Sequence, residues 1–167
     1  MVTPRRQHCP RPVDDRRATG FLFPSIGLAS NSLDISTPYY LNLAPNYDAI
    51  IAPRFIENRG EALETEFRYL NRYSEWAVSS SYLPNDQSEN IDRWLIDVKE
   101  EGFVSEQWGT EIDYTKVSDI DYFSDLGLAN LAVKRSTHLN QQGALNYTSD
   151  NWRGRLEVQR YQTIAVV

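Results

Sequence analysis

The sequence predicts an all-β protein built as an antiparallel meander. Two observations lead to this fold class: apolar and polar residues alternate with period 2 along much of the chain, and turn-forming residues separate the alternating segments. A third observation excludes helical membrane proteins. None of the 167 residues lies in a run that approaches the ~18 uncharged apolar residues of a membrane-spanning helix. Strands of a membrane barrel alternate apolar and polar residues, so this observation does not exclude them.

The period-2 alternation is clearest in the middle of the chain. Four consecutive segments keep one face apolar and the other charged or polar: 63–70, 75–82, 93–99 and 107–115. Three weaker segments follow the same pattern: 130–134, 145–148 and 155–159. Together with strand-like runs near the N-terminus, these segments predict about ten strands.

Turn residues fall between the alternating segments, as sequential hairpins require. They occur at 58–60, 71–72, 84–86, 101–102, 140–143 and 149–151. The longest polar connection after 84–92 is Val117–Gly127, which carries Asp119, Asp121 and Asp125. These carboxylates lack the central glycine and closing glutamate of a calcium loop, so we interpret the segment as a solvated loop and expect no metal site.

The N-terminal third carries prolines inside or beside strand-like runs, at Pro24, Pro38, Pro45 and Pro53. Proline cannot donate a ladder hydrogen bond, so in sheets it occupies edges, first positions or bulges. Successive proline-bearing segments at the start of a meander therefore predict a sheet edge that pairs poorly.

Periodicity alone leaves two environments open for the apolar face. It could pack in a soluble β-barrel or sandwich that binds a small hydrophobic ligand, which would need a closed sheet of about eight strands with an apolar interior. It could instead contact lipid, with the charged face lining a wet lumen and aromatic residues near the strand ends. A face as charged as this one favours a wide barrel, so we expect part of a large transmembrane β-barrel that forms an open, curved sheet in isolation.

The barrel hypothesis assigns each side chain of the alternating segments to one environment. The residues expected to face the lumen are Glu64, Glu66, Arg68, Arg93, Asp97, Lys99, Glu111 and Asp113. The residues expected to face lipid are Phe67, Tyr69, Trp76, Trp94, Trp108, Ile112 and Tyr114.

Composition offers little support for other functions. A net charge of −6 argues against a nucleic-acid partner, although Arg5, Arg6, Arg11, Arg16 and Arg17 cluster near the N-terminus. His8 and His138 have no nucleophile pattern nearby, so we expect no enzyme activity and no cofactor. Cys9 is the only cysteine, and the N-terminus carries no apolar stretch that could serve as the core of a signal peptide.

Several long blocks of the sequence resemble one family. They are DRRATGFLFPSIG at 15–27, PYYLNLAPNYD at 38–48, EFRYL at 66–70, YLP at 82–84, RWL at 93–95 and DYTKVSD at 113–119. In this order they resemble the LPS-assembly protein LptD family, also called organic solvent tolerance proteins. The resemblance runs from about Val13 to the C-terminus and fades after Leu126.

The resemblance implies a function for the chain. It implies insertion of lipopolysaccharide into the outer leaflet of the cell outer membrane, through a barrel that opens sideways at a seam weakened by prolines matching Pro24 and Pro38. It further implies an irregular arm at 1–19 followed by the first barrel strands at 20–167. The partners it implies are lipopolysaccharide, the LptE lipoprotein, periplasmic LPS-bridge proteins and outer-membrane lipid. Residues 1–12 depart from the family pattern, and Cys9 matches none of the family's disulfide cysteines, so we expect a partial barrel.

Overall fold

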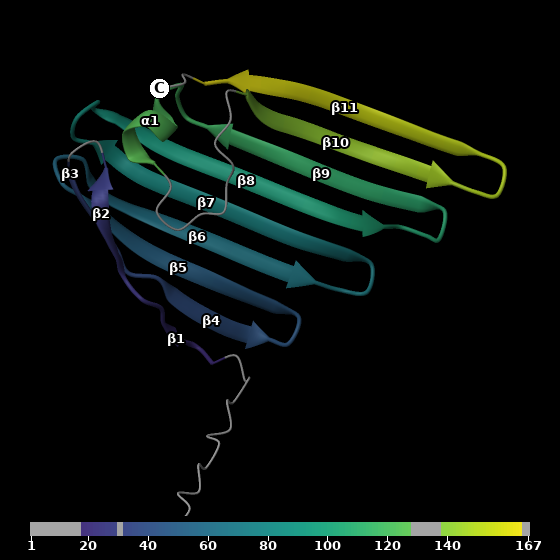
Figure 1. Cartoon of the computed structure of the whole chain (residues 1–167), viewed down its shortest axis with the longest axis horizontal. Coiled ribbons are helices and arrows are strands. Elements are labelled where there is room, and N and C mark those ends of the chain that lie inside the picture. The colour runs from purple at the N-terminus through teal and green to yellow at the C-terminus, as the bar shows by residue number, and fades with distance from the viewer. Residues whose placement is uncertain (1–17, 30–31, 128–137, 165–167) are drawn as a thin grey trace, which may run out of the picture.

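The computed structural model describes residues 18–29, 32–127 and 138–164. These residues form one antiparallel sheet of 11 strands and one short helix (Figure 1). The elements in chain order are β1 (Gly20–Phe21), β2 (Ser25–Ala29), β3 (Ser32–Ser36), β4 (Tyr39–Ala44), β5 (Tyr47–Ile56), β6 (Gly60–Leu70), β7 (Ser74–Asp86), β8 (Ile91–Phe103), β9 (Trp108–Val117), α1 (Tyr122–Leu126), β10 (His138–Thr148) and β11 (Arg153–Thr163).

The strands follow one another as a meander, in the order β1-β4-β5-β6-β7-β8-β9-β10-β11, while β2 pairs with β3 and β3 also pairs with β5. Within the described ranges, β1 pairs only with β4 and β11 pairs only with β10, so the sheet is open. The predicted all-β meander is confirmed, and its open form agrees with part of a β-barrel. No helix among the residues described is long and apolar enough to cross a membrane.

Some predicted turns form, and others lie inside strands. The turn at 58–60 is confirmed, with Asn58 at φ 63° and Gly60 at φ 126°, whereas 84–86 lies in β7, 101–102 in β8 and 140–143 in β10. Gly102 marks a close approach between strands: a Cβ there would lie 2.7 Å from the Cβ of Ser74 and 2.8 Å from the carbonyl of Tyr73. The predicted strand at 130–134 lies outside the described residues.

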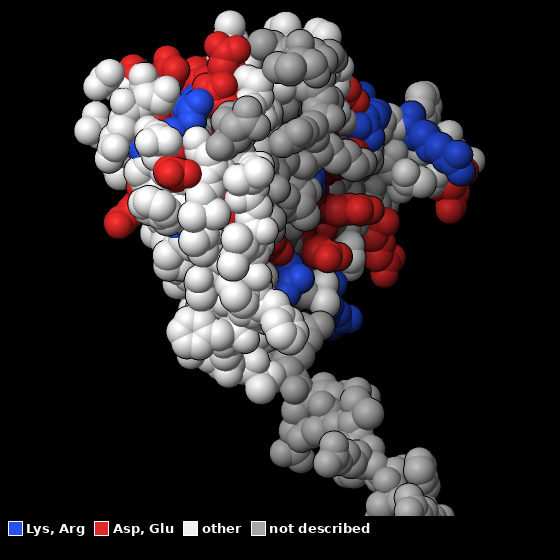
Figure 2. Space-filling view, turned by 60° about the vertical axis from the view of Figure 1, so that its left-hand side comes forward, with Lys and Arg blue, Asp and Glu red and all other residues white. Residues whose placement is uncertain are grey.

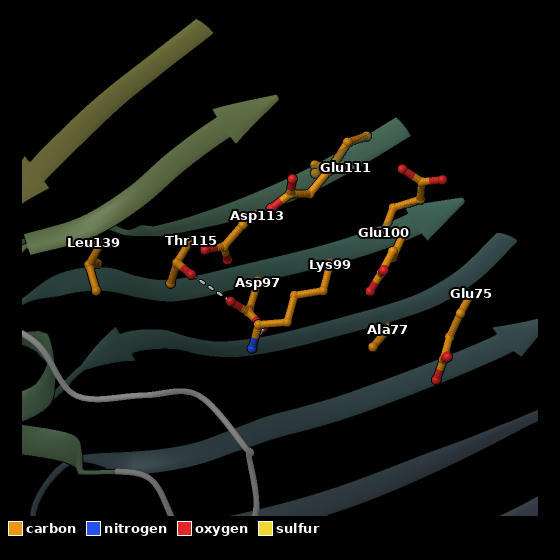
Figure 3. Close-up of a pocket in the computed structure, with 11 residues that line it drawn as sticks. Glu75, Ala77, Asp97, Lys99, Glu100, Glu111, Asp113, Thr115 and Leu139 are labelled. Atoms are coloured by element: carbon orange, nitrogen blue, oxygen red, sulfur yellow. Dashed lines mark hydrogen bonds and ion pairs between the residues drawn. The ribbon is translucent and has the colours of Figure 1, made fainter. Parts of the chain in front are cut away.

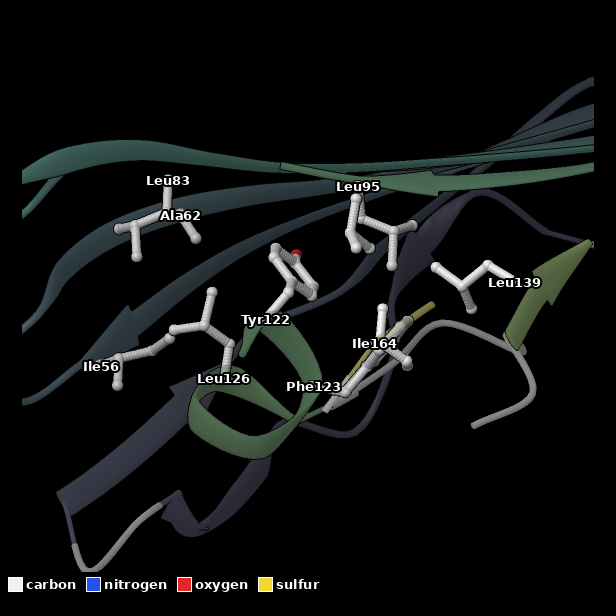
Figure 4. Close-up of a cluster of buried hydrophobic side chains, with 10 residues drawn as sticks. Ile56, Ala62, Leu83, Leu95, Tyr122, Phe123, Leu126, Leu139 and Ile164 are labelled. Carbon is white, nitrogen blue, oxygen red and sulfur yellow. The ribbon is translucent and has the colours of Figure 1, made fainter. Parts of the chain in front are cut away.

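The connection that follows β9 is not the solvated loop that the sequence predicts. It contains α1, whose side chains Tyr122, Phe123 and Leu126 are buried against the sheet (Figure 4). Their partners come from the strand ends near α1 and from the segment after β11: Ile56, Ala62, Leu83, Leu95, Val117, Leu139 and Ile164. A five-residue helix is too short to produce a recognisable helical period, so its core side chains were hidden in a polar stretch.

Candidate functional site

The strand registers give the sheet two chemically different faces. Residues paired across antiparallel strands point to the same side, so each line of partners defines one face. One such line runs through Ile50, Glu66, Ser79, Asp97 and Thr115 on β5 to β9. We call the face that contains this line, on which α1 packs, the charged face, and the opposite one the apolar face.

The charged face brings together all eight side chains that the sequence assigns to a lumen. They are Glu64, Glu66, Arg68, Arg93, Asp97, Lys99, Glu111 and Asp113. A hollow of about 600 Å³ on this face is lined by Glu75, Asp97, Lys99, Glu111 and Asp113, among others (Figure 3). Acidic groups outnumber basic ones there, so this part of the face attracts cationic groups.

The apolar face brings together all seven side chains that the sequence assigns to lipid. They are Phe67, Tyr69, Trp76, Trp94, Trp108, Ile112 and Tyr114. Charged side chains on this face of the strands are few, namely Glu61, Asp92, Glu100, Lys116 and Arg160. Figure 2 shows a broad surface with few charged side chains, beside a hollow in which acidic side chains gather. Many large apolar side chains of the apolar face are exposed to solvent, which is unusual for a soluble monomer.

Aromatic side chains gather toward the strand ends of the apolar face. Close ring contacts join Tyr47 to Tyr69 at 6.3 Å and Trp108 to Tyr147 at 4.8 Å between centroids, both near the rim opposite α1. Aromatic residues at the ends of membrane strands place amphipathic rings at the headgroup level. The arrangement is therefore the one expected of aromatic girdles.

The first hairpin of the sheet, formed by residues 20–44, is interrupted by a proline in each of its two strands. Pro24 lies between β1 and β2, and Pro38 lies between β3 and β4. The register also slips by one residue across the gap, because Phe21 pairs with Tyr39 whereas Ser25 pairs with residue 36. An extra residue on one strand of a pair is a bulge, which leaves part of the ladder unmade.

A third proline lies at the same level on the next strand. The carbonyl of Pro53 on β5 accepts a hydrogen bond from the N–H of Thr37 at 3.1 Å, so this peptide unit faces the gap between β3 and β4. Paired antiparallel residues at such a position exchange two bonds, and proline lacks the donor for the second. The prolines therefore weaken three neighbouring strands at one level, which the sequence pattern alone did not reveal.

A buried ion network fixes the α1 connection to the charged face. The guanidinium of Arg93 on β8, whose side chain is 1% exposed, contacts Asp119 at 2.6 Å, Asp125 at 2.8 Å and Asp86 at 3.3 Å. Arg59 adds contacts to Asp86 at 2.7 Å and to Asp125 at 3.4 Å. The interpretation of the acidic connection as solvated is therefore wrong, because two of its three carboxylates neutralise buried arginine.

A second arginine links α1 to the interrupted hairpin. Arg54 on β5 contacts Asp34 of β3 at 2.7 Å and Glu64 of β6 at 2.8 Å, and it also donates to the carbonyl of Leu126 at the end of α1. The side chains of Arg54 and Glu64 are each 2% exposed. One side chain thus joins the helix, the second extended run of the hairpin and the centre of the sheet.

Tyr122 closes the space between these two networks. Its ring lies 5.7 Å from the guanidinium carbon of Arg93, and burial raises the pKa of its hydroxyl to about 12. Figure 4 shows the ring directed from α1 toward the sheet. The sequence gives no strong signal for this contact, because it joins residues that are far apart in the chain.

Of the two histidines considered for catalysis, His138 alone lies in the described ranges. His138 begins β10 and its ring meets that of Tyr161 edge to face at 6.3 Å, while His8 and Cys9 lie outside the described residues. In the described part of the chain, no group of three or more His, Cys, Asp or Glu side chains is placed to hold a metal ion.

The geometry defines a class of protein first: an open segment of a barrel-type antiparallel sheet, with one charged face and one apolar face. Comparison with known proteins then identifies the family that the chain resembles. Residues 91–166 match the family model "LptD: LPS transport system D".

Curated relatives extend the match to nearly the whole chain. LPS-assembly protein LptD of Pseudomonas entomophila (strain L48) is 43% identical over 164 residues, covering 93% of this chain and 17% of the relative. The protein of the same name from Pseudomonas aeruginosa (strain LESB58) is 46% identical over 159 residues, covering 90% of this chain and 17% of the relative. The predicted resemblance to LptD is confirmed, and the chain spans less than a fifth of the length of these relatives.

Proposed function

We propose that this chain forms consecutive wall strands of an outer-membrane β-barrel that assembles lipopolysaccharide at the cell surface. The observation that carries the proposal is the two-faced sheet, in a sequence similar along 90% of its length to LPS-assembly proteins. The activity and partners belong to proteins more than five times as long as the matched segment, so they come to this chain as part of the proposal.

Strand length supports a membrane location. The strands β5 to β11 contain 10 to 13 residues each. A tilted strand needs about 9–11 residues to cross the hydrocarbon core, whereas strands of globular proteins usually have about 5–6. In this proposal, the apolar face contacts lipid and the charged face lines the aqueous lumen.

The connections between strands orient the sheet in the membrane. Those at 45–46, 71–73, 104–107 and 149–152 contain two to four residues and share one rim. The opposite rim carries short connections at 57–59 and 87–90 and also the longer connection from β9 to β10, whose described part includes α1. Because outer-membrane barrels have short periplasmic turns and longer extracellular loops, the α1 rim faces the cell exterior.

The proline-interrupted hairpin is proposed as one side of a lateral opening. Pro24 and Pro38 remove ladder donors from the first two extended runs, and a missing ladder bond is worth about 0.5–1.5 kcal/mol. A seam weakened at this level could part while the strong pairing of β5 to β11 persists. Protection of a sheet edge from aggregation is a competing role for the same prolines.

The partners of the proposed barrel follow from the family and from the charge of the lumen face. Lipopolysaccharide is the transported lipid, periplasmic LPS-bridge proteins deliver it, and the LptE lipoprotein fills the lumen. The acidic hollow around Asp97 and Glu111 favours contact with basic groups of whatever protein occupies the lumen.

A segment exchange tests the proposed function directly. The matching segment of the P. aeruginosa relative would be replaced by this chain, and lipopolysaccharide at the cell surface would be measured after depletion of the native protein. We expect surface delivery to be retained. A matched exchange carrying Glu64→Leu and Asp97→Leu on the charged face should fail, since it would place apolar groups in the lumen. Correct membrane insertion without surface lipopolysaccharide for the unmodified exchange would contradict the proposal.

A soluble barrel or sandwich that binds a hydrophobic ligand is not favoured. That alternative requires a closed sheet with an apolar interior. The described sheet is open, and its charged face carries Glu64, Arg93 and Asp97. We therefore retain the membrane barrel alone.

A further inference from the structure

Two basic side chains stand out on the apolar face. Lys116 of β9 and Arg160 of β11 are the only cations on this face of the described strands, and both are exposed. Neither has an ion-pair partner among the described residues, in contrast to the arginines of the charged face. The ammonium of Lys116 lies 5.7 Å from the ring centroid of Trp94, which holds it near the rim that carries α1.

A hollow of about 670 Å³ on the apolar face joins the two cations. Lys116, Tyr114 and Ile112 line it from β9, and Val158 and Arg160 line it from β11. Gly143 of β10 lies between these strands, and a Cβ at this position would have no atom within 4 Å. The hollow is deeper here because glycine has no side chain to fill it. Tyr114 and Arg160 align across Gln141, two strand spacings or about 10 Å apart.

The hollow is amphipathic along the strand direction. Its cations lie toward the α1 rim, and the apolar side chains of Ile112 and Val158 lie further from that rim. A lipid with an anionic headgroup and acyl chains has the same order of chemistry along the membrane normal. An uncharged headgroup would leave both cations without a counter-charge on a face that carries few charged side chains.

We propose that Lys116 and Arg160 form a binding site for the phosphate groups of a phosphorylated glycolipid in the outer leaflet, with its acyl chains over Ile112 and Val158. This inference rests on the proposed function, because it requires the apolar face to contact lipid and the α1 rim to face outward. It adds a site on the lipid-facing side of the barrel wall, separate from the charged face and from the proline-interrupted hairpin. The site would bind the lipid after its delivery, or would fix the barrel beside neighbouring lipids of the outer leaflet.

Lipid titration of the full chain in dodecyl maltoside micelles tests the site. The probe is bisphosphorylated lipid A, compared with the same acylated disaccharide without phosphate, and bound lipid is counted by native mass spectrometry. We expect Lys116→Gln and Arg160→Gln each to weaken binding of the phosphorylated lipid about fivefold, and the pair about 25-fold. Binding of the phosphate-free lipid should be unchanged.

The matched control is the pair Lys99→Gln and Arg155→Gln, which removes two cations from the charged face. It should leave lipid binding as in the unmodified chain. Lys116→Arg combined with Arg160→Lys keeps both charges and should bind the phosphorylated lipid as the unmodified chain does.

Equal binding of both lipids, or no effect of the double glutamine variant in a chain that still inserts, would overturn the site alone. A chain that stays soluble without detergent and binds neither lipid would overturn the proposed function as well. Inorganic phosphate at millimolar concentration should not compete, and full competition would show a simple anion site instead.

Discussion

Replacing Arg93 with methionine is the most informative single change to the α1 connection. The substitution keeps most of the side-chain volume and removes the charge that Asp86, Asp119 and Asp125 share. Loss of one partner from a buried ion pair costs about 3–5 kcal/mol, because the remaining charges are left uncompensated. Arg59 still contacts Asp86 at 2.7 Å and Asp125 at 3.4 Å, so we expect the lower end, about 3 kcal/mol.

Hydrogen exchange of the helix amides measures this loss. The N–H groups of Asp125 and Gly127 donate to the carbonyls of Asp121 and Phe123, so they exchange only when α1 opens. A cost of about 3 kcal/mol corresponds to roughly a hundredfold faster exchange at both amides. Amides in the middle of β6 and β7 should keep their protection, since the ladder between these two strands holds them.

A control separates buried charge from charge in general. Arg155 also contacts two carboxylates on the charged face, Glu111 at 3.0 Å and Glu157 at 2.6 Å, but its side chain is 42% exposed. Because solvent screens these exposed contacts, Arg155→Met should leave α1 and the exchange of its amides unchanged. Adding Asp119→Asn to Arg93→Met should recover part of the protection. Exchange at Asp125 and Gly127 that is the same in Arg93→Met and in the unmodified chain would show that Arg93 does not stabilise α1.

Three further predictions follow from the packing. The pKa of Tyr122 is raised to about 12 from about 10 in an unfolded chain, so α1 should lose about 3 kcal/mol of stability as the pH rises from 10 to 12; fluorescence quenching should detect its release, and Tyr122→Phe should abolish the pH dependence. Gly102→Ala should destabilise the β7–β8 hairpin by about 1–3 kcal/mol in denaturant titration, whereas Gly143→Ala, with open space around it, should be nearly neutral. Arg54→Met should accelerate hydrogen exchange in β3 and in α1 together, and acceleration in only one of them would contradict the link through Arg54.

The sequence predicted the sheet and its two faces because both depend on a local rule. Alternation with period 2 fixes which side of a strand each residue occupies, so the opposite placement of Glu66 and Phe67 could be read without the structure. The prolines at 24 and 38 likewise interrupt their own strands, so their local effect was predictable.

Features that depend on contacts between distant residues could not be read in the same way. The network of Arg93 joins β8 to carboxylates 26 and 32 positions later, and nothing near Arg93 in the sequence indicates them. Turn residues misled at 101–102 because glycine serves close strand packing as well as turns. The level shared by Pro53 and the hairpin gap became visible only when the register aligned residue 37 with it.

In the proposed barrel, the apolar face contacts lipid and the charged face contacts water. Nitroxide labels placed one at a time along 110–115 of β9, in a Cys9→Ser chain reconstituted in phospholipid vesicles, distinguish these two environments. Collision with oxygen, which concentrates in lipid, should peak at 112 and 114, and collision with a water-soluble nickel chelate should peak at 111 and 113. Uniform accessibility to the nickel chelate at all six positions, or an alternation of the opposite phase, would show that the apolar face does not contact lipid.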